Sequence, residues 1–255
     1  MTAMVTAAGA GKAQERCRAV AAPVARRLWH IDTKGYERLP DTGPAILCPN
    51  HISFLDSAFL MLTVPRNISF VGKAEYMDSW KTKHLFPALG MIPIDRAGGS
   101  KSRAALDVAA TVLRRGELFG IFPEGTRSRD GYLYKGRTGA ARLAIEIGCP
   151  IYPVGIIGTD AIQPPGAKLP KLRRSCTIRI GRPIRPDRYQ HRGTAHLANR
   201  QMTDEVMFEI GELTGQRYVN TYAGKTADDD LLAAPARVAS VIDPVDDRPL
   251  AAAVG

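Results

Sequence analysis

Residues 45–56 read AILCPNHISFLD, an apolar run that is followed by a histidine and, five positions later, by an aspartate. The run at 45–48 is short and unbroken, which predicts a buried strand. The residues after it predict a polar turn and then a helix over about 54–62, which Pro65 ends. A strand that leads into a helix in this way is the unit from which α/β sheets are built.

His51 and Asp56 admit two interpretations. A carboxylate on one imidazole nitrogen holds the tautomer that leaves the other nitrogen ready to take a proton, so the pair fits a general base and its partner. Ser53 and Asp56 also fit a capping box, in which both side chains satisfy free backbone donors at a helix start. A His-x4-Asp pair arises by chance in roughly a third of chains of this composition, so further residues must decide.

The rest of the chain repeats the alternation of strand and helix. Apolar runs predict strands at 67–71, 91–94, 118–122, 151–157 and 175–180. Helical spacing predicts helices at 74–89, 100–116, 138–147 and 194–213. The fold class expected is therefore α/β, with a mostly parallel central sheet that helices flank on both faces. Pro153 inside a predicted strand indicates an edge position or a bulge.

One folded domain is expected over residues 12–222. Residues 1–11 are rich in Ala, Gly and Thr, show no signal-peptide pattern and are predicted to be disordered. The tail at 223–255, in which Ala, Asp and Pro dominate, is predicted to be disordered and acidic. The longest apolar run, at 58–64, is far short of the ~20 residues that cross a bilayer. Four scattered cysteines favour neither a zinc site nor a disulfide framework, and they suggest a reducing compartment.

Residues 12–30 form the predicted N-terminal amphipathic helix, which we expect to be kinked at Pro23. It packs its apolar face on the core or lies on a membrane with its arginines at the headgroups, and both can hold for different faces of the helix. The whole chain carries a formal charge of +10, and the acidic tail leaves +13 on the rest. Such a surface suits anionic lipid, an anionic substrate or nucleic acid. No nucleic-acid motif or stacking position accompanies the basic residues, so nucleic acid is not expected as a partner.

Four predicted strands each lead into polar residues: His51, Lys73, Arg96 and the segment 124–127. The carboxyl ends of parallel strands meet at one edge of a sheet, where open α/β folds bind ligands. We therefore expect one crevice with an imidazole, a carboxylate and several cations, but no obvious serine or cysteine nucleophile. Such a crevice would take a proton from an anionic substrate while arginines hold its phosphate.

The same residues resemble a known family. Four segments are similar, in order, to the four motifs of the glycerolipid acyltransferases, and most of all to those of bacterial 1-acylglycerol-3-phosphate acyltransferases. They are NHISFLD (50–56), GMIPIDR (90–96), FPEGTRS (122–128) and IYPV (151–154). The resemblance covers about 35–185. It implies transfer of an acyl chain from acyl-CoA or acyl carrier protein to the free hydroxyl of a lysophospholipid, 1-acylglycerol 3-phosphate, which makes phosphatidic acid.

By position, the family pattern implies His51 as general base and Asp56 as its partner. It implies a phosphate site formed by Lys73, Arg96, Gly125, Thr126 and Arg127. Asn50, Glu124 and Ser128 would position the substrate or the loop, and Pro153 with Val154 would lie on the acyl side. The resemblance implies no cofactor and no metal, and a peripheral place on the cytoplasmic face of an anionic membrane.

Several alternatives stay open. Glu124 could form a structural ion pair with an arginine, Arg96 could be a solvated surface charge, and Gly125 could serve the backbone alone. The acceptor could be a glycolipid, a lyso-aminolipid or glycerol 3-phosphate. A different class of function is a non-catalytic basic protein that binds membrane or nucleic acid. For an enzyme, we expect direct transfer to the hydroxyl without an acyl-enzyme.

Overall fold

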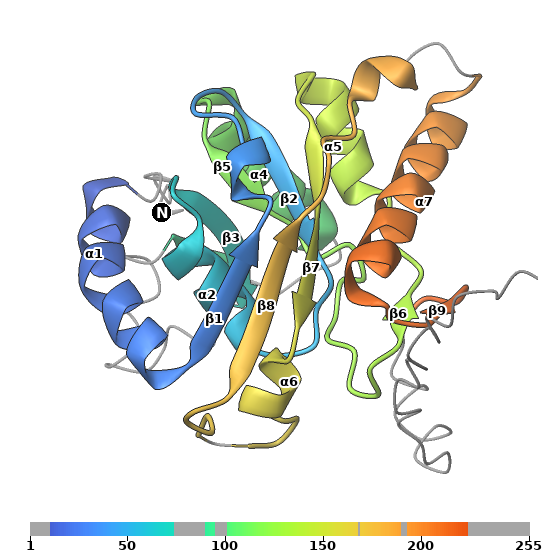
Figure 1. Cartoon of the computed structure of the whole chain (residues 1–255). Coiled ribbons are helices and arrows are strands. Elements are labelled where there is room, and N and C mark those ends of the chain that lie inside the picture. Colours follow the sequence, from blue (N-terminus) through green and yellow to red (C-terminus); the bar gives the residue numbers. More distant parts are fainter. Residues whose placement is uncertain (1–10, 74–89, 95–100, 168, 190–192, 224–255) are drawn as a thin grey trace, which may run out of the picture. The chain divides into compact units, whose positions relative to one another are not determined.

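The computed structural model describes residues 11–73, 90–94, 101–167, 169–189 and 193–223 (Figure 1). Its helices are α1 (Gly11–Leu28), α2 (Leu55–Thr63), α4 (Lys101–Arg114), α5 (Gly139–Ile147), α6 (Thr159–Ile162) and α7 (Ala195–Thr214). Its strands are β1 (His30–Lys34), β2 (Ala45–Pro49), β3 (Ile68–Lys73), β4 (Met91–Ile94), β5 (Leu118–Gly120), β6 (Leu133–Tyr134), β7 (Ile151–Ile157), β8 (Ser175–Ile180) and β9 (Tyr218–Val219).

A seven-stranded sheet organises this part of the chain, in the order β1-β8-β7-β2-β5-β3-β4. Strands β7, β2, β5, β3 and β4 run parallel to one another, and β8 joins β7 in the antiparallel direction. The predicted α/β class with a mostly parallel sheet is therefore confirmed. The carboxyl ends of the five parallel strands share one edge, which is where ligands bind in such sheets.

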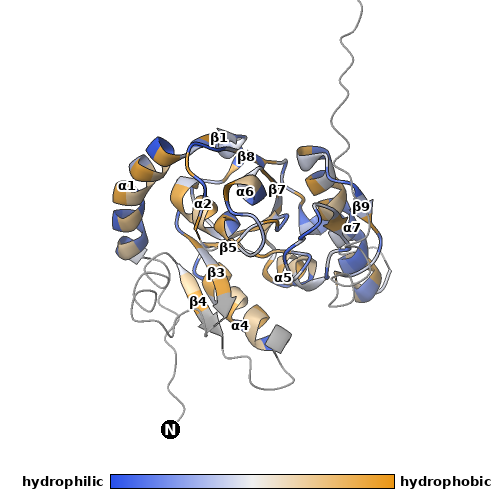
Figure 2. Cartoon of the chain, turned by 90° about the horizontal axis from the view of Figure 1, so that it is seen from below, coloured by the Kyte–Doolittle hydropathy of each residue, from blue (hydrophilic) through white to orange (hydrophobic). Residues whose placement is uncertain are grey.

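Two hydrophobic layers cover the two faces of the sheet, and β2 contributes side chains to both layers. Ile46 and Cys48 pack in the layer under α4, α5 and α7, whereas Ala45 and Leu47 pack in the layer that includes α2. This alternation follows from the two-residue period of a strand. Helix α1 lies beyond α2, on the side away from α7 (Figures 1 and 2).

Pro153 lies in an interior strand, so the predicted edge position is wrong, and the pairing next to it is offset by one residue in the partner segment. Ile151 pairs with Ile184, and Val154 pairs with Ile180. From 151 to 154, β7 advances by three residues, while the segment that pairs with it, from 184 to 180, advances by four. The Pro153 carbonyl accepts from the Gly181 N–H at 2.8 Å. The ladder is irregular where proline has no N–H to give, so the residue is tolerated there.

The shortest elements escape sequence prediction. Strands β6 and β9 have two residues each and α6 has four, too few to show a period. Strand β1 reads HIDTK and lies at the edge of the sheet, where its polar residues face solvent. The predicted strand 118–122 ends earlier, at Gly120. The predicted helix at 74–89, the acidic tail from 224 and residues 1–10 lie outside the described residues.

Helix α1 begins at Gly11 and ends at Leu28, two residues before the predicted end, because His30 already pairs with β8. The helix continues through Pro23, where the sequence predicts a kink. Proline loses one helical hydrogen bond, and the remaining bonds hold the helix together. Among the described residues, none of the helices combines the length and the apolar character that a membrane crossing needs.

Polar side chains attach α1 to the domain. The buried Gln14 amide exchanges hydrogen bonds with the backbone N–H and carbonyl of Ile68, at 3.0 and 2.9 Å. Arg18 donates to two carbonyls of the turn before β3, at 3.0 and 2.9 Å. Val20 and Val24 lie on the other side of the helix and are 72% and 54% exposed. Figure 2 shows this mixture of hydrophilic and hydrophobic residues along α1.

Two glycines test how α7 packs on β7. A Cβ at Gly155 would lie 2.6 Å from Leu213 Cβ and 3.1 Å from its carbonyl carbon, whereas a Cβ at Gly211 meets only Leu133, at 3.8 Å. We expect Gly155→Ala to lower the free energy of unfolding by about 1–3 kcal/mol through overpacking. Gly211→Ala, the matched control inside the helix, should raise it by up to about 1 kcal/mol. Urea denaturation measures both, and equal effects would contradict this packing.

Candidate active site

His51 and Asp56 face each other at the carboxyl end of β2. His51 follows the strand, and Asp56 lies in the first turn of α2. The distance from His51 Nδ1 to Asp56 Oδ2 is 2.8 Å. The Asp56 side chain is fully buried, and the His51 side chain is 18% exposed. The pair therefore has the geometry of an imidazole that a buried carboxylate orients, as in general-base sites.

Asp56 also holds the start of α2. Its Oδ2 accepts from the backbone N–H groups of Ile52 and Ser53, both at 2.8 Å. Its Oδ1 accepts from Thr159 Oγ1 at 2.5 Å. The serine half of the predicted capping box is different, since Ser53 Oγ accepts from the Leu55 N–H at 3.4 Å. Four donors satisfy the buried carboxylate, which would otherwise be costly to bury.

Thr159 is a residue that sequence reasoning missed. It is fully buried and begins α6, two residues after the end of β7. Because β7 is parallel to β2 and adjacent to it, a residue just after β7 reaches the start of α2. The order of the strands, which the sequence does not reveal, brings Thr159 to Asp56. Its position just beyond a predicted strand at the same edge was the available signal.

The His51 imidazole stacks on the ring of Phe122, with the centroids 3.8 Å apart and the planes at 18°. Its Nε2 makes no hydrogen bond to any residue that the structure describes. The backbone of His51 is held on both sides: its N–H donates to Glu124 Oε1 at 3.2 Å, and its carbonyl accepts from the Ser128 N–H at 2.7 Å. The loop after β5 thus fixes the imidazole in place.

Glu124 is 1% exposed and bridges two backbone segments. Besides the His51 N–H, it accepts from the Tyr134 N–H at 2.9 Å. Burial raises the pKa of Glu124 to about 7, although these two N–H groups act in the opposite direction. No arginine pairs with it within the described part of the chain. The contacts of Glu124 are therefore those of a residue that holds the loop.

Asn50 is fully buried and ties the end of β2 to β7. Its Oδ1 accepts from the Ile156 N–H at 2.7 Å, and its Nδ2 donates to the Ile156 carbonyl at 2.9 Å. The second Nδ2 hydrogen bond goes to Gln216 Oε1 at 2.8 Å. Asn50 therefore fixes the backbone that leads into His51.

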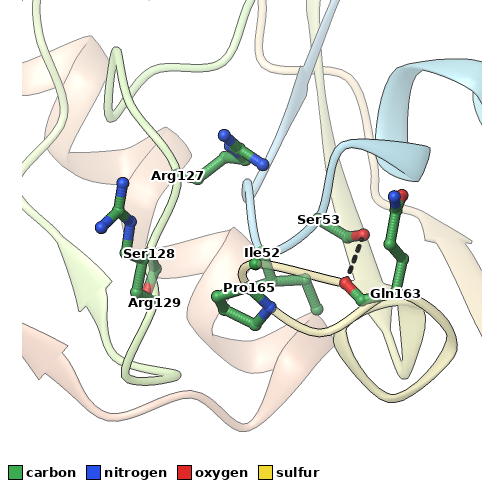
Figure 3. A pocket seen from close by; sticks show the side chains of 8 residues that line it. Ile52, Ser53, Arg127, Ser128, Arg129, Gln163 and Pro165 are labelled. Carbon is green, nitrogen blue, oxygen red and sulfur yellow. Dashed lines mark hydrogen bonds between the residues drawn. The ribbon is translucent and has the colours of Figure 1, made fainter. Parts of the chain in front are cut away.

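A pocket of about 360 Å³ opens at Ile52 and Ser53, the two residues after His51, and neither His51 nor Asp56 lines it (Figure 3). It is lined by Ile52, Ser53, Arg127, Ser128, Arg129, Gln163, Pro165 and Gly166. Figure 3 shows the segment 127–129 on one side, Ser53 and Gln163 on the other, and Ile52 and Pro165 between them. The Ser53 hydroxyl donates to the Gln163 carbonyl at 3.2 Å. The first wall is basic and the second is uncharged, so the pocket suits an anion.

The turn before the basic wall presents Gly125, Thr126 and Arg127 to solvent. Gly125 has φ +77, a conformation that favours glycine, and a Cβ there would lie 2.9 Å from Arg137 Nε. Arg127 makes no hydrogen bond or ion pair with the residues that the structure describes, which leaves its guanidinium free for a ligand. Arg129, two positions on, lines the same pocket, and sequence reasoning missed it.

The structure does not show the other predicted residues at this pocket. Lys73 ends β3 at the same sheet edge, but its side chain lies outside the described part, as does Arg96. Pro153 and Val154 are buried inside β7 and do not line the pocket. Among the described residues, no group of His, Cys, Asp and Glu could hold a metal ion.

Comparisons with known proteins agree with this geometry. A family model described as Acyltransferase matches residues 30–157. A chloroplastic 1-acyl-sn-glycerol-3-phosphate acyltransferase of Brassica napus is 30% identical over 142 residues, which are 55% of this chain and 41% of that protein. A protein with the same activity name from Borreliella burgdorferi is 29% identical over 137 residues, 52% of this chain and 55% of its own. The chain thus spans about half the length of these relatives, or less.

Among solved structures, the lysophosphatidic acid acyltransferase PlsC of Thermotoga maritima is similar, with a TM-score of 0.61 and 23% identity. The likeness covers 78% of this chain and 82% of that one, and at this identity it bears on the fold alone. The family model is the stronger finding, because it spans half of the chain and contains both the His51 and the Glu124 segments. As the four motifs predicted, the chain belongs to the acyltransferase family.

Proposed function

We propose that this protein transfers an acyl chain from an acyl thioester, acyl-CoA or acyl carrier protein, to the free hydroxyl of 1-acylglycerol 3-phosphate, and so makes phosphatidic acid. The observation that carries the proposal is the His51–Asp56 pair, in which Nε2 of His51 has no partner among the described residues. Ser128, whose N–H binds the His51 carbonyl, lines a pocket that has a basic wall. The activity names of the relatives point the same way.

In the proposed reaction, His51 Nε2 takes the proton of the acceptor hydroxyl while its oxygen attacks the thioester carbonyl. The carbon–sulfur bond then breaks, and the imidazolium returns the proton to the leaving thiolate. Asp56 keeps Nδ1–H in place and stabilises the imidazolium. The products are phosphatidic acid and a free thiol.

Direct transfer needs no covalent nucleophile. Cys48, Cys149 and Cys176 are buried. Burial raises the pKa of each of these thiols, which keeps them protonated and unreactive. The Ser53 hydroxyl donates its proton to the Gln163 carbonyl, a backbone oxygen. These contacts support a reaction without an acyl-enzyme.

The basic wall supports a phosphate-bearing acceptor over a glycolipid. Arg127 is free to donate, and Arg129 lines the same pocket. A guanidinium offers paired N–H donors that match phosphate oxygens. In the proposal, Arg127 and Arg129 hold the phosphate, with Lys73 and Arg96 added from the neighbouring strand ends. Gly125 and Thr126 shape the turn that presents Arg127.

The proposed location is the cytoplasmic face of an anionic membrane, where the acceptor lipid resides. Polar side chains of helix α1 form hydrogen bonds with the rest of the domain, whereas Val20 and Val24 are exposed to solvent. Next to its end, a basic loop displays Leu169 and Leu172, 80% and 56% exposed. Trp29 Nε1 joins helix and loop by donating to the Lys171 carbonyl at 2.9 Å. Apolar side chains among basic ones suit an anionic interface.

Removal of the base tests the reaction. We expect His51→Ala to lower kcat at least about a hundredfold, because general-base catalysis contributes roughly 10² to 10⁴, about 3–5 kcal/mol of barrier. Thiol release from acyl-CoA in the presence of 1-acylglycerol 3-phosphate measures the rate. His196→Ala, at an exposed histidine on α7, is the control and should react at the wild-type rate. Near-normal turnover in a folded His51→Ala protein would refute the assignment.

Removal of one pocket guanidinium tests the acceptor. We expect Arg127→Ala to raise the KM for 1-acylglycerol 3-phosphate by roughly ten- to a hundredfold, since a hydrogen bond to a charged group is worth about 1.5–3 kcal/mol. Activity on 1-acylglycerol, which lacks the phosphate, should change little. Arg142→Ala, at an exposed arginine on α5, is the control. An unchanged KM with the phosphate acceptor would count against the phosphate role.

Charge placed on α1 tests membrane attachment. We expect Val20→Glu with Val24→Glu to weaken binding to phosphatidylglycerol vesicles at least about tenfold, because two carboxylates would face an anionic apolar interface. The matched control is Leu197→Glu with Phe208→Glu, at exposed apolar positions of α7. Flotation of the protein with vesicles gives the bound fraction. Equal effects of both pairs would argue against a specific role for α1.

A further inference from the structure

Residues 215–222, here called the C-terminal strap, run back from α7 along the loop that follows β5. Strand β9 of the strap pairs with β6 of that loop, and Figure 1 places both near the lower end of α7. The Leu133 N–H donates to the Arg217 carbonyl, and the Lys135 N–H donates to the Thr221 carbonyl, both at 3.0 Å. The strap lies beyond the residues that the family model matches.

One side chain of the strap, Gln216, contacts residues that support the active site. Gln216 Oε1 accepts from Asn50 Nδ2 at 2.8 Å, and Gln216 Nε2 donates to the Gly131 carbonyl at 2.8 Å. Asn50 directly precedes His51, and Gly131 belongs to the loop that carries Arg127. A single amide therefore joins the strand that bears the base to the loop that bears the phosphate-binding wall.

On the strand side, Asn50 depends on this contact. Its other hydrogen bonds, to and from the backbone of Ile156, leave one Nδ2 hydrogen. Asn50 is fully buried, so the Gln216 oxygen is what satisfies that hydrogen in place of water. Without the Gln216 oxygen, the buried Asn50 N–H would be unsatisfied, which favours a rotated Asn50 side chain. Any such movement passes directly to the backbone of His51.

On the loop side, Gly131 is next to a second set of contacts. Asp130 accepts from Ser128 Oγ at 3.0 Å and from Tyr134 Oη at 2.6 Å. Ser128 and Tyr134 both contribute to the contacts that hold His51. The Ser128 N–H donates to the His51 carbonyl. The Tyr134 N–H donates to the Glu124 carboxylate, which also accepts from the His51 N–H. Anchoring Gly131 therefore steadies the loop at the point where it grips the histidine.

We propose that Gln216 is a positioning residue for the acyl transfer, which sets the separation between His51 and the phosphate held by the basic wall. The inference rests on the proposed function. Acyl transfer to a held hydroxyl is sensitive to such a separation, because a displacement of about 1 Å from the reactive geometry can cost roughly a hundredfold in rate. The two hydrogen bonds of the Gln216 amide fix this separation, one at the end of β2 and one at the loop after β5.

The two bonds can be removed separately. Gln216→Glu keeps an oxygen for Asn50 but loses the donor to the Gly131 carbonyl, so we expect mainly a higher KM for 1-acylglycerol 3-phosphate. Gln216→Leu loses both bonds, and we expect kcat to fall about tenfold or more as well. Arg217→Ala is the matched control, since its side chain is exposed and its backbone bond to Leu133 remains. It should leave kcat and KM unchanged.

A spectroscopic readout separates positioning from stability. Long-range ¹H–¹⁵N correlation of the imidazoles reports the tautomer and surroundings of His51, whose signals are identified by their loss in His51→Ala. We expect these signals to shift in Gln216→Leu and to stay in place in Arg217→Ala. If Gln216→Leu does not fold, the near-isosteric Gln216→Glu decides the matter through its KM and its His51 signals.

The outcomes are distinct from those of the proposed function. Absence of acyl transfer by the wild-type protein would overturn the function, and the imidazole signals would still report whether Gln216 acts on His51. An active wild-type protein with unchanged kcat, KM and His51 signals in both Gln216 variants would overturn the inference and leave the function standing. Lower stability of Gln216→Leu with unchanged His51 signals would assign Gln216 a purely structural role and would overturn the inference too.

Discussion

The hydrogen bond between Asp56 and His51 is the contact on which the rest of the site depends, and it exists only because a carboxylate can be buried there. Asp56 is fully buried and accepts from four donors. Two are backbone N–H groups of the turn, one is His51 and one is Thr159. Because Thr159 follows β7, the carboxylate is satisfied only when β7 lies beside β2. The order of the strands is therefore required for a buried Asp56, and through Asp56 for the orientation of the His51 imidazole.

Residues of the motifs divide into two kinds that a sequence pattern alone cannot separate. His51 and Arg127 leave polar atoms without partners among the described residues, so these atoms can meet a ligand. Asn50, Glu124 and Ser128 are buried and use their polar atoms on the protein. The raised pKa of Glu124, about 7, records the cost of burying a carboxyl that holds two backbone segments. Burial and hydrogen bonding distinguish the two kinds.

Sequence reasoning reached what local periodicity encodes. It predicted the parallel strands, the helices between them and the shared edge where His51 and the segment 124–127 meet. It missed β1, β6, β9 and α6, which are short or polar and show no period. It also missed Thr159, Arg129 and Gln216. Thr159 and Gln216 act through contacts between segments distant in the chain, and such contacts depend on strand order, which a single sequence does not display.

The separation between base and phosphate is the quantity that this architecture controls. His51 lies after β2 and Arg127 lies after β5, on two adjacent parallel strands. Strand spacing alone would leave two flexible turns at the ends. The Glu124 and Ser128 bonds to the His51 backbone join the turns at the front, and the amide of Gln216 joins them behind. Loops that are linked at several points move together, so a hydroxyl aimed by its phosphate stays within reach of the imidazole.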